Sequence, residues 1–294
     1  MSAADRLQTT IAGLDRSRVA LYAVLLALVA FYLAPLESGF MTAFKTPDGF
    51  RTTTPFALPP LGEFTLSAWG TAFDRLSNGL LNSALMAVPA TVLSALFGSL
   101  AAYGLTNLSW RGQIGVLVLF VAGVFIPYQA VLVPLTQFWS FVDLGGRIPL
   151  ALVADNEGLI NLSITHVAYG IPICTVLFRS YYATIDDEML EAARLDGASA
   201  ATIYRRIILP LSVPIFAVTL IYQFTQIWND LLFAIVLVSN PSNQVVTVAL
   251  NQLQGSFVQQ FNLQMAGAFV AALPTLVVYV LFGEQFAKGV AGDS

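Results

Sequence analysis

Six runs of apolar residues, each long enough to cross a lipid bilayer, constrain this chain more than any other feature of its sequence. They lie near residues 19–36, 79–105, 113–136, 158–180, 211–238 and 264–283. A hydrocarbon core about 30 Å thick needs about 20 apolar residues per helix. Backbone groups inside lipid must be hydrogen-bonded within the protein, which favours helices. The runs therefore predict an all-α, polytopic membrane bundle of six transmembrane helices.

The composition agrees with this fold class. The chain is 57% hydrophobic and only 10% charged, whereas soluble domains are about 25% charged. Six spans consume most of the 294 residues, so no large soluble domain is expected. The net charge of −4 disfavours nucleic-acid binding, which needs a basic surface.

The basic residues predict the orientation, because positively charged loops tend to stay in the cytoplasm. With six spans and the N-terminus inside, nine of the 13 basic residues are cytoplasmic and four are external. The cytoplasmic residues are Arg6, Arg16, Arg18, Arg111, Arg179, Arg194, Arg205, Arg206 and Lys288, and the external residues are Lys45, Arg51, Arg75 and Arg147. We therefore expect a multi-pass protein of the cell membrane with both termini in the cytoplasm.

The runs also divide the chain into segments. These are a cytoplasmic N-terminus (1–18), a first transmembrane helix (19–36), an external loop (37–78), a core of five transmembrane helices (79–284) with a cytoplasmic loop (181–210), and a cytoplasmic tail (285–294). The first run could be a signal peptide, but it is long for one and lacks a small-residue cleavage site, which favours an uncleaved helix.

Two external stretches have a distinct composition. Four prolines, Pro47, Pro55, Pro59 and Pro60, predict an irregular loop over 37–78. Apolar and charged residues alternate over 137–157, which predicts an external interfacial helix and loop.

The cytoplasmic segment 184–210 predicts two short helices. Thr184 and Asp187 have the spacing of a capping box for the first helix. Gly197 is expected to end this helix, since glycine readily adopts the left-handed conformation of a helix stop. Ser199 is placed to cap the second helix, which runs toward Arg205 and Arg206.

The order of residues in this segment resembles the EAA loop of binding-protein-dependent ABC importer permeases. Glu191, Ala192 and Ala193 are followed after three residues by Gly197, and after nine more by Ile207, Leu209 and Pro210. The whole chain is most similar to the sugar-importing branch, which includes a maltose permease subunit. Further matching pieces are Ala101–Gly104, Ile126-Pro127, Trp228-Asn229-Asp230 and Phe286–Gly289.

The resemblance implies a type I ABC importer permease fold and a set of partners. In that family the EAA loop docks into a groove of a separate ATPase, with the glutamate pairing to an arginine there. We expect a second permease subunit, two copies of the ATPase that bind ATP and Mg²⁺, an external solute-binding protein and a sugar substrate. The segment 239–264 is expected to contact the binding protein, or else to be a plain solvated loop. No cofactor is expected in this chain.

Several residue patterns exclude other functions. The sequence contains no Gly-Lys pair, so it lacks the phosphate-binding loop of an ATPase. With a single histidine, His166, and a single cysteine, Cys174, it offers no catalytic grouping and no metal-ligand set. We expect His166 to be a hydrogen-bonded bundle residue, with a proton relay as the alternative, and Cys174 to be a small buried hydrophobe.

Sugar hydroxyls need polar and aromatic partners, so Tyr222, Asn229 and Asp230 are candidate residues of a substrate pathway. Tight helix packing is the alternative for each of them. Asp230 could instead be the coupling carboxylate of an ion-gradient-driven secondary transporter, or a hydrogen-bonded residue at a helix break. A secondary transporter, and then a membrane enzyme or scaffold, are the alternatives to an ABC permease.

Overall fold

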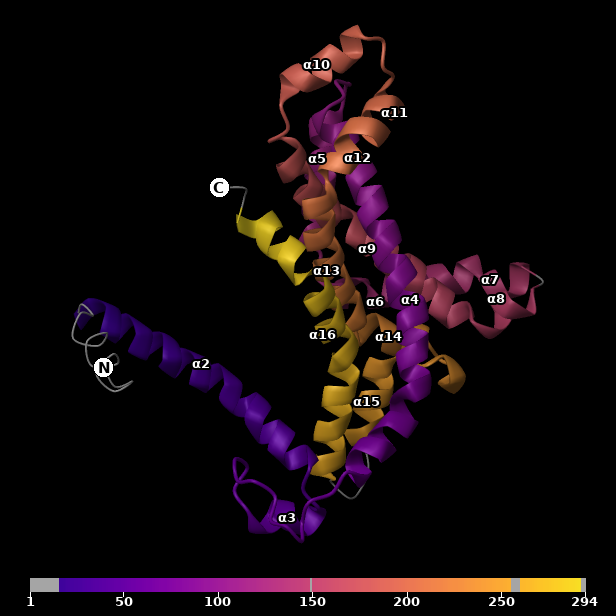
Figure 1. Cartoon of the computed structure of the whole chain (residues 1–294). Helices are drawn as coiled ribbons and strands as arrows, with labels where there is room; N and C mark the ends of the chain where they lie inside the picture. Colours follow the sequence, from indigo (N-terminus) through magenta and orange to yellow (C-terminus); the bar gives the residue numbers. More distant parts are fainter. Residues whose placement is uncertain (1–15, 149, 255–259, 292–294) are drawn as a thin grey trace. The chain divides into compact units, whose positions relative to one another are not determined.

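The computed structural model describes residues 16–148, 150–254 and 260–291, and these residues are helical with short connections. The chain forms two compact units. The first comprises residues 1–72 and 256–269, and the second comprises residues 73–255 and 270–294. Two long helices, α4 (Ser67–Thr106) and α16 (Phe261–Ala291), contribute residues to both units (Figure 1).

The first unit contains α2 (Arg16–Ala43) and α3 (Pro47–Thr52). Aromatic rings close its core, with Phe40 edge-on to Phe269 at 5.4 Å and Phe44 stacked on Phe64 at 5.6 Å. Lys45 is fully buried, and its ammonium donates to the carbonyl of Thr54 at 2.8 Å. Burial lowers the pKa of Lys45, although Glu37 acts in the opposite direction.

The prediction of an irregular loop over 37–78 is wrong in its extent. Helix α2 continues to Ala43, and α4 begins at Ser67. Between them lies α3, which has Pro47 in its first turn and Thr46 as its N-cap, whose hydroxyl accepts from the amide of Gly49. Proline is tolerated in a first helical turn because its missing N–H has no partner there. The prolines therefore allow a short helix that their number alone did not suggest.

The second unit contains the remaining helices of the bundle (Figure 1). They are α5 (Gln113–Val124), α6 (Tyr128–Val142), α7 (Leu144–Arg147), α8 (Ala151–Asp155), α9 (Glu157–Tyr182), α10 (Asp187–Leu195), α11 (Ala200–Ile203), the π-helical turn η1 (Tyr204–Ile208), α12 (Leu209–Leu211), α13 (Val213–Trp228), α14 (Leu232–Leu237), the 3₁₀ turn η2 (Pro241–Asn243) and α15 (Val246–Gln254). Helix α9 is central, since it packs against α5, α13 and α14.

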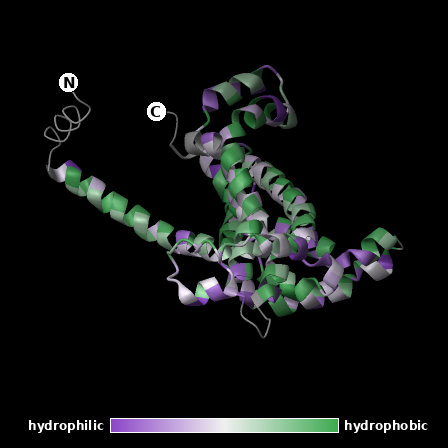
Figure 2. Cartoon of the chain, turned by 60° about the horizontal axis from the view of Figure 1, so that its bottom comes forward, coloured by the Kyte–Doolittle hydropathy of each residue, from purple (hydrophilic) through white to green (hydrophobic). Residues whose placement is uncertain are grey.

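Among the described residues, four helices are long and apolar enough to cross a membrane: α2, α4, α9 and α16. Two bent pairs raise the number to six if each pair counts as one span. The bend is 103° between α5 and the helices α6–α7, and 76° between the helices before and after Ser212. The six predicted runs agree with the upper count, although the second bent pair covers residues 200–228 and so overlaps only part of the predicted run 211–238. Figure 2 shows apolar residues along the bundle helices, with hydrophilic residues in the turn formed by α10 and α11.

Two of the predicted runs are therefore not continuous helices. The run 113–136 breaks between Val124 and Tyr128, where Pro127 has no N–H to donate. The run 211–238 bends at Ser212 and breaks a second time between Trp228 and Leu232. By contrast, Pro89, Pro172 and Pro274 lie inside continuous helices.

Close backbone approach joins α4 to α9. A Cβ added at Gly98 would overlap Cys174, and Cys174 is fully buried, as predicted for a small hydrophobe. Small residues at helix interfaces let membrane helices approach closely. The predicted interfacial segment 137–157 consists of the end of α6 followed by α7 and α8.

Candidate coupling hairpin and helix-break cluster

The segment that joins α9 to α13 folds into a hairpin of two short helices, α10 and α11. Asp186 caps α10, since its carboxylate accepts from the amide of Glu188 at 2.9 Å. Thr184 does not cap the helix as predicted, because its hydroxyl donates to the carbonyl of Tyr181 at 2.7 Å. Asp186 lies nearer the helix start and takes the capping role. The positive end of the helix dipole stabilises its negative charge there.

Gly197 ends α10, as predicted. Its φ is +81°, in the left-handed region, and no atom lies within 4 Å of the Cβ that another residue would add there. The amide of Ala198 donates to the carbonyl of Ala193 at 3.0 Å, which closes the helix end. Ser199 caps α11, also as predicted, by accepting from the amide of Thr202 at 3.2 Å.

The two faces of α10 differ. Leu190 is 1% exposed and joins the hydrophobic core, with Ala193 half-buried against it. Met189, Glu191, Ala192 and Leu195 are exposed, and Leu195 is 89% exposed. Ala193 lies on the inner face of α10, away from Met189 and Ala192. The hairpin therefore presents a narrow apolar stripe beside a carboxylate.

The other residues of the EAA pattern lie where the hairpin rejoins the bundle. Ile207 is half-buried in η1, and Leu209 and Pro210 form α12, with Pro210 exposed. The second helix runs toward Arg205 and Arg206, as predicted. It does so through a π-helical turn, a feature found frequently at functional sites.

Buried hydroxyls tie this turn to the bundle. The Oγ of Ser99 on α4 lies 2.8 Å from the hydroxyl of Tyr204 and 2.6 Å from that of Tyr182 at the end of α9. Ser99 and Tyr182 are almost fully buried, and Tyr204 is 8% exposed. Tyr103, also on α4, donates to the carbonyl of Ala200 at 3.0 Å. The hairpin is thus held to two long helices by side chains as well as by the chain itself.

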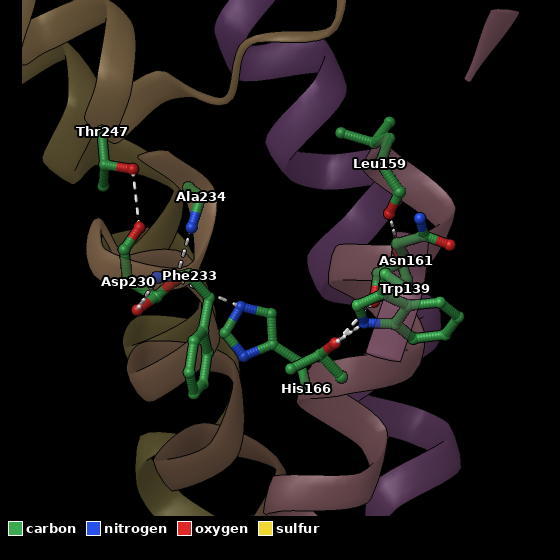
Figure 3. Close-up of polar contacts among 10 residues, drawn as sticks. Trp139, Leu159, Asn161, His166, Asp230, Phe233, Ala234 and Thr247 are labelled. Carbon is green, nitrogen blue, oxygen red and sulfur yellow. Dashed lines mark hydrogen bonds and ion pairs between the residues drawn. The ribbon is translucent and has the colours of Figure 1, made fainter. Parts of the chain in front are cut away.

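A second polar group surrounds the break between α13 and α14 (Figure 3). The carboxylate of Asp230 accepts from the amides of Ala234 at 3.3 Å and Phe233 at 3.5 Å, which caps α14. Its carbonyl accepts from the hydroxyl of Thr247 at 2.7 Å. Asp230 is therefore a hydrogen-bonded residue at a helix break, one of the alternatives that its sequence context left open.

His166 of α9 faces this carboxylate, as Figure 3 shows, with its Nε2 3.5 Å from Oδ2 of Asp230. Both side chains are nearly buried, at 6% and 5% exposed. The ring of Phe233 contacts the rings of Tyr128 at 4.9 Å and Tyr169 at 5.0 Å. We call Tyr128, His166, Tyr169, Tyr222 and Asp230 the helix-break cluster.

A small cavity of about 30 Å³ opens within this cluster, lined by Tyr128, His166, Tyr169, Tyr222 and Gln226 among others. That volume holds about one water molecule, so no sugar fits there in this conformation. Of the predicted pathway residues, Tyr222 lines the cavity and Asp230 borders it through His166. Asn229 does not line it, and its amide donates to the carbonyl of Thr225 at 2.9 Å.

Sequence reasoning missed Tyr128, Tyr169 and Gln226. They come from three different helices, α6, α9 and α13, so no local sequence pattern brings them together. His166, the single histidine, and Asp230, a carboxylate within an apolar run, stand out in the sequence, but their contact was not predicted. Within the described ranges, no three His, Cys, Asp or Glu side chains gather where they could hold a metal ion.

Comparisons with known proteins give a consistent result. Residues 94–287 match the model of the family described as "Binding-protein-dependent transport system inner membrane component". The chain is 51% identical to the xylose/arabinose import permease protein XacI of Haloferax volcanii, over 94% of this chain and 93% of that protein. It is 28% identical to the glucose import system permease protein GlcU of Saccharolobus solfataricus, over 92% and 93% of the two chains.

Among solved structures, the fold is similar to a chain of a bacterial ABC transporter involved in the import of the acidic polysaccharide alginate. The TM-score is 0.70 at 19% identity, covering 97% of this chain and 99% of the other. At that identity the likeness concerns the fold alone.

Proposed function

Because the chain belongs to the family of binding-protein-dependent transport system inner membrane components, the permease subunits of ABC importers, we propose that it carries a sugar into the cell. The sugar class is supported by relatives named for xylose and arabinose import and for glucose import. Energy comes from a separate ATPase that binds ATP and Mg²⁺. A screen of monosaccharides against the cognate binding protein by thermal shift tests the class, and stabilisation by amino acids or peptides alone would contradict it.

The α10–α11 hairpin is the single observation that supports coupling to an ATPase. It carries Glu191, Ala192 and Gly197 on exposed positions, and Leu190 and Ile203 anchor it in the core. The narrow apolar stripe of α10 fits a groove on another protein, since apolar anchors beside a charged contact are typical of interfaces. In this proposal Glu191 meets a basic residue of the ATPase.

A matched pair of variants tests the role of Glu191. Glu191→Ala removes the proposed contact, whereas Glu188→Ala removes an exposed carboxylate from the first turn of the same helix. We expect partial loss of uptake and of ATPase retention during purification only for Glu191→Ala, because one exposed ion pair contributes about 1 kcal/mol or less. Equal behaviour of the two variants would argue against the docking role.

We place the hairpin end of the second unit in the cytoplasm. Support comes from Arg194, Arg205 and Arg206 in the hairpin and from Arg179 near the end of α9, since basic residues favour the cytoplasmic side. Both termini are cytoplasmic in this proposal. Residues 1–15 and 292–294 lie outside the described part of the chain.

We further propose that a second permease subunit pairs with this chain over two ATPase copies, and that an external binding protein delivers the sugar. The segment 239–264, which includes η2 and α15, lies at the proposed external end and would contact the binding protein; residues 255–259 are not among those described. A solved structure with a similar fold is a bacterial alginate ABC transporter in complex with an alginate pentasaccharide-bound periplasmic protein.

The helix-break cluster is the proposed substrate pathway. Tyr222 and Gln226 of α13 and Tyr128 of α6 offer the aromatic and polar side chains that sugar hydroxyls need. The breaks on both sides of the cluster give short helices that can shift against α9, as in transporters that expose a site alternately to each side. Asp230 then acts by setting the position of α14, whereas Asn229 bonds back to α13.

A further inference from the structure

A second, larger cavity lies in the second unit, with a volume of about 340 Å³. Its walls come from the C-terminal half of α6, the end of α8, the start of α9 and the end of α14. We propose that this cavity is a sugar-binding subsite at the external mouth of the permease, distinct from the helix-break cluster. This inference rests on the proposed sugar-import function.

The place of the cavity follows from α9. The hairpin attaches at the C-terminal end of this 26-residue helix, and the cavity lies at its N-terminal end, beside Glu157 and Gly158. A helix of that length extends about 39 Å, which spans the hydrocarbon core. With the hairpin in the cytoplasm, the cavity opens on the external side.

The walls are built from close contacts between segments far apart in the sequence. A Cβ added at Gly158 would lie 2.7 Å from the carbonyl oxygen of Leu237, so α9 begins directly against the end of α14. Asn243 donates to the carbonyl of Asp155 at 2.5 Å, which connects the far wall to α8. The indole of Trp139 donates to Thr165 at 2.9 Å, which fixes the aromatic wall (Figure 3).

One polar atom in the wall of the cavity, the Oδ1 of Asn161, lacks a hydrogen-bond partner among the described residues. Asn161 is 5% exposed and lines the cavity, and its Oδ1 is buried. Leaving a buried polar group unpaired costs about 1–3 kcal/mol, and such groups in native proteins usually have a partner that includes water or a ligand. This oxygen has no accessible surface in the structure, so the amide must turn about χ2 before a ligand hydroxyl in the cavity can donate to it.

The chemistry of the lining suits a neutral polyol. Asp155 and Glu157 offer carboxylate acceptors, Asn161 and Asn240 offer amides, and Trp139 offers an apolar wall. The lining includes no lysine or arginine, which disfavours an anionic ligand. A volume of about 340 Å³ lies within the usual range for small-molecule sites, roughly 300–1,000 Å³. A monosaccharide fits these properties.

The cavity and the helix-break cluster share one short element. The first turn of the six-residue α14 is capped by Asp230, which faces His166, and its last turn forms part of the cavity wall. Figure 3 shows Trp139 and Asn161 on one side of α9 and His166 on the side that faces Asp230. A sugar bound in the cavity would therefore meet α14 before it reaches the cluster.

The experiment uses the assembled transporter in nanodiscs without its binding protein, with D-xylose, L-arabinose and D-glucose as probes. Saturation-transfer NMR reports sugar contact, and uptake assays with the binding protein report apparent KM and maximal rate. The variants are Asn161→Leu and Glu157→Gln, with Asp74→Asn as the control, since Asp74 is exposed on α4 and does not line the cavity. Asn161→Leu should fold as well as the wild type, because it replaces a side chain whose buried Oδ1 has no hydrogen-bond partner with an apolar one of similar size.

We expect the wild type and Asp74→Asn to show the NMR signal with at least one of the three sugars. Each cavity variant should weaken that signal and raise the apparent KM about five-fold, the effect of losing about one hydrogen bond, with little change in maximal rate. Wild-type uptake without a signal, or an unchanged signal in both variants, overturns the subsite and leaves the proposed function standing. Variants that change only the affinity for the binding protein also overturn it. Failure of the wild type to take up any sugar would contradict the proposed function itself.

Discussion

The hydroxyl of Tyr204, in the turn that follows the α10–α11 hairpin, lies 2.8 Å from the Oγ of Ser99 on α4. Ser99 also contacts Tyr182, the last residue of α9. Hydrogen bonds between buried groups are costly to break without replacement. A movement of the hairpin must therefore move α4 and α9 as well or break these hydrogen bonds. The hydroxyls of Ser99, Tyr182 and Tyr204 are thus a candidate route by which movement of the ATPase reaches the bundle.

Tyr204→Phe and Ser99→Ala should loosen this coupling. Tyr204→Phe removes one buried hydrogen bond and Ser99→Ala removes two. Each bond contributes about 1 kcal/mol, and the loss of one changes a two-state equilibrium about five-fold. We expect the ATPase to remain in the purified complex and hydrolysis to continue, while sugar uptake per ATP hydrolysed falls several-fold. The measurement is the ratio of uptake to hydrolysis in proteoliposomes. Tyr32→Phe is the control, since Tyr32 is 72% exposed on α2, and an unchanged ratio in both variants would refute the link.

Gly197 provides a test of the hairpin geometry. Its φ of +81° penalises any residue with a branched Cβ by roughly 1–2 kcal/mol, and the space around it is open. The effect of Gly197→Val is therefore on the backbone alone. We expect it to abolish uptake and to weaken ATPase retention, with near-normal amounts of the permease in the membrane.

Gly197→Asn is the matched control, because asparagine tolerates the left-handed conformation better than other residues. It should keep most of the uptake. If uptake by Gly197→Val equalled uptake by Gly197→Asn, the hairpin would not be the coupling element.

Asp230 is expected to act through the position of α14. Asp230→Ala removes the acceptor for the amides of Phe233 and Ala234 and should destabilise the complex by about 1 kcal/mol, as for the loss of a helix cap. Asp230→Asn keeps one acceptor oxygen and should be intermediate in thermal stability and retain uptake. If Asp230→Asn instead abolished uptake without loss of stability, a proton-coupled role for this carboxylate would gain support.

The local signals in the sequence predicted much of the hairpin. Gly197 and Ser199 act as a helix stop and a helix cap because these roles depend on the residue's own backbone and neighbouring amides. Thr184 was misassigned because Asp186, two residues later, competes for the same capping position. The length of the apolar runs likewise predicted the long helices.

The helix-break cluster could not be predicted in the same way. His166 and Asp230 are 64 residues apart, and their contact depends on how α9 packs against the break after α13. Apolar composition is the same in a continuous span and in a broken one, so the runs 113–136 and 211–238 gave no sign of their bends beyond Pro127, Pro214 and the polar pair Asn229-Asp230. That the Oδ1 of Asn161 lacks a hydrogen-bond partner also depends on the packed structure and cannot be predicted from the sequence.

Labelling of single cysteines tests the orientation. In a Cys174→Ala background, Leu195→Cys in the hairpin and Leu61→Cys before α4 replace residues that are 89% and 104% exposed, so both sites are open to reagent. A membrane-impermeant maleimide added to intact cells should label only the cysteine at position 61, and permeabilised cells should show both. Labelling of position 195 in intact cells would contradict a cytoplasmic hairpin.

Uptake by a reconstituted complex tests the central claim most directly. Proteoliposomes would contain this chain, its partner permease and the ATPase, with ATP and Mg²⁺ inside and sugar-loaded binding protein outside. We predict sugar accumulation that needs all of these components, continues after ion gradients are dissipated, and is lost with Gly197→Val. Accumulation driven by an ion gradient in vesicles lacking the ATPase would contradict the account.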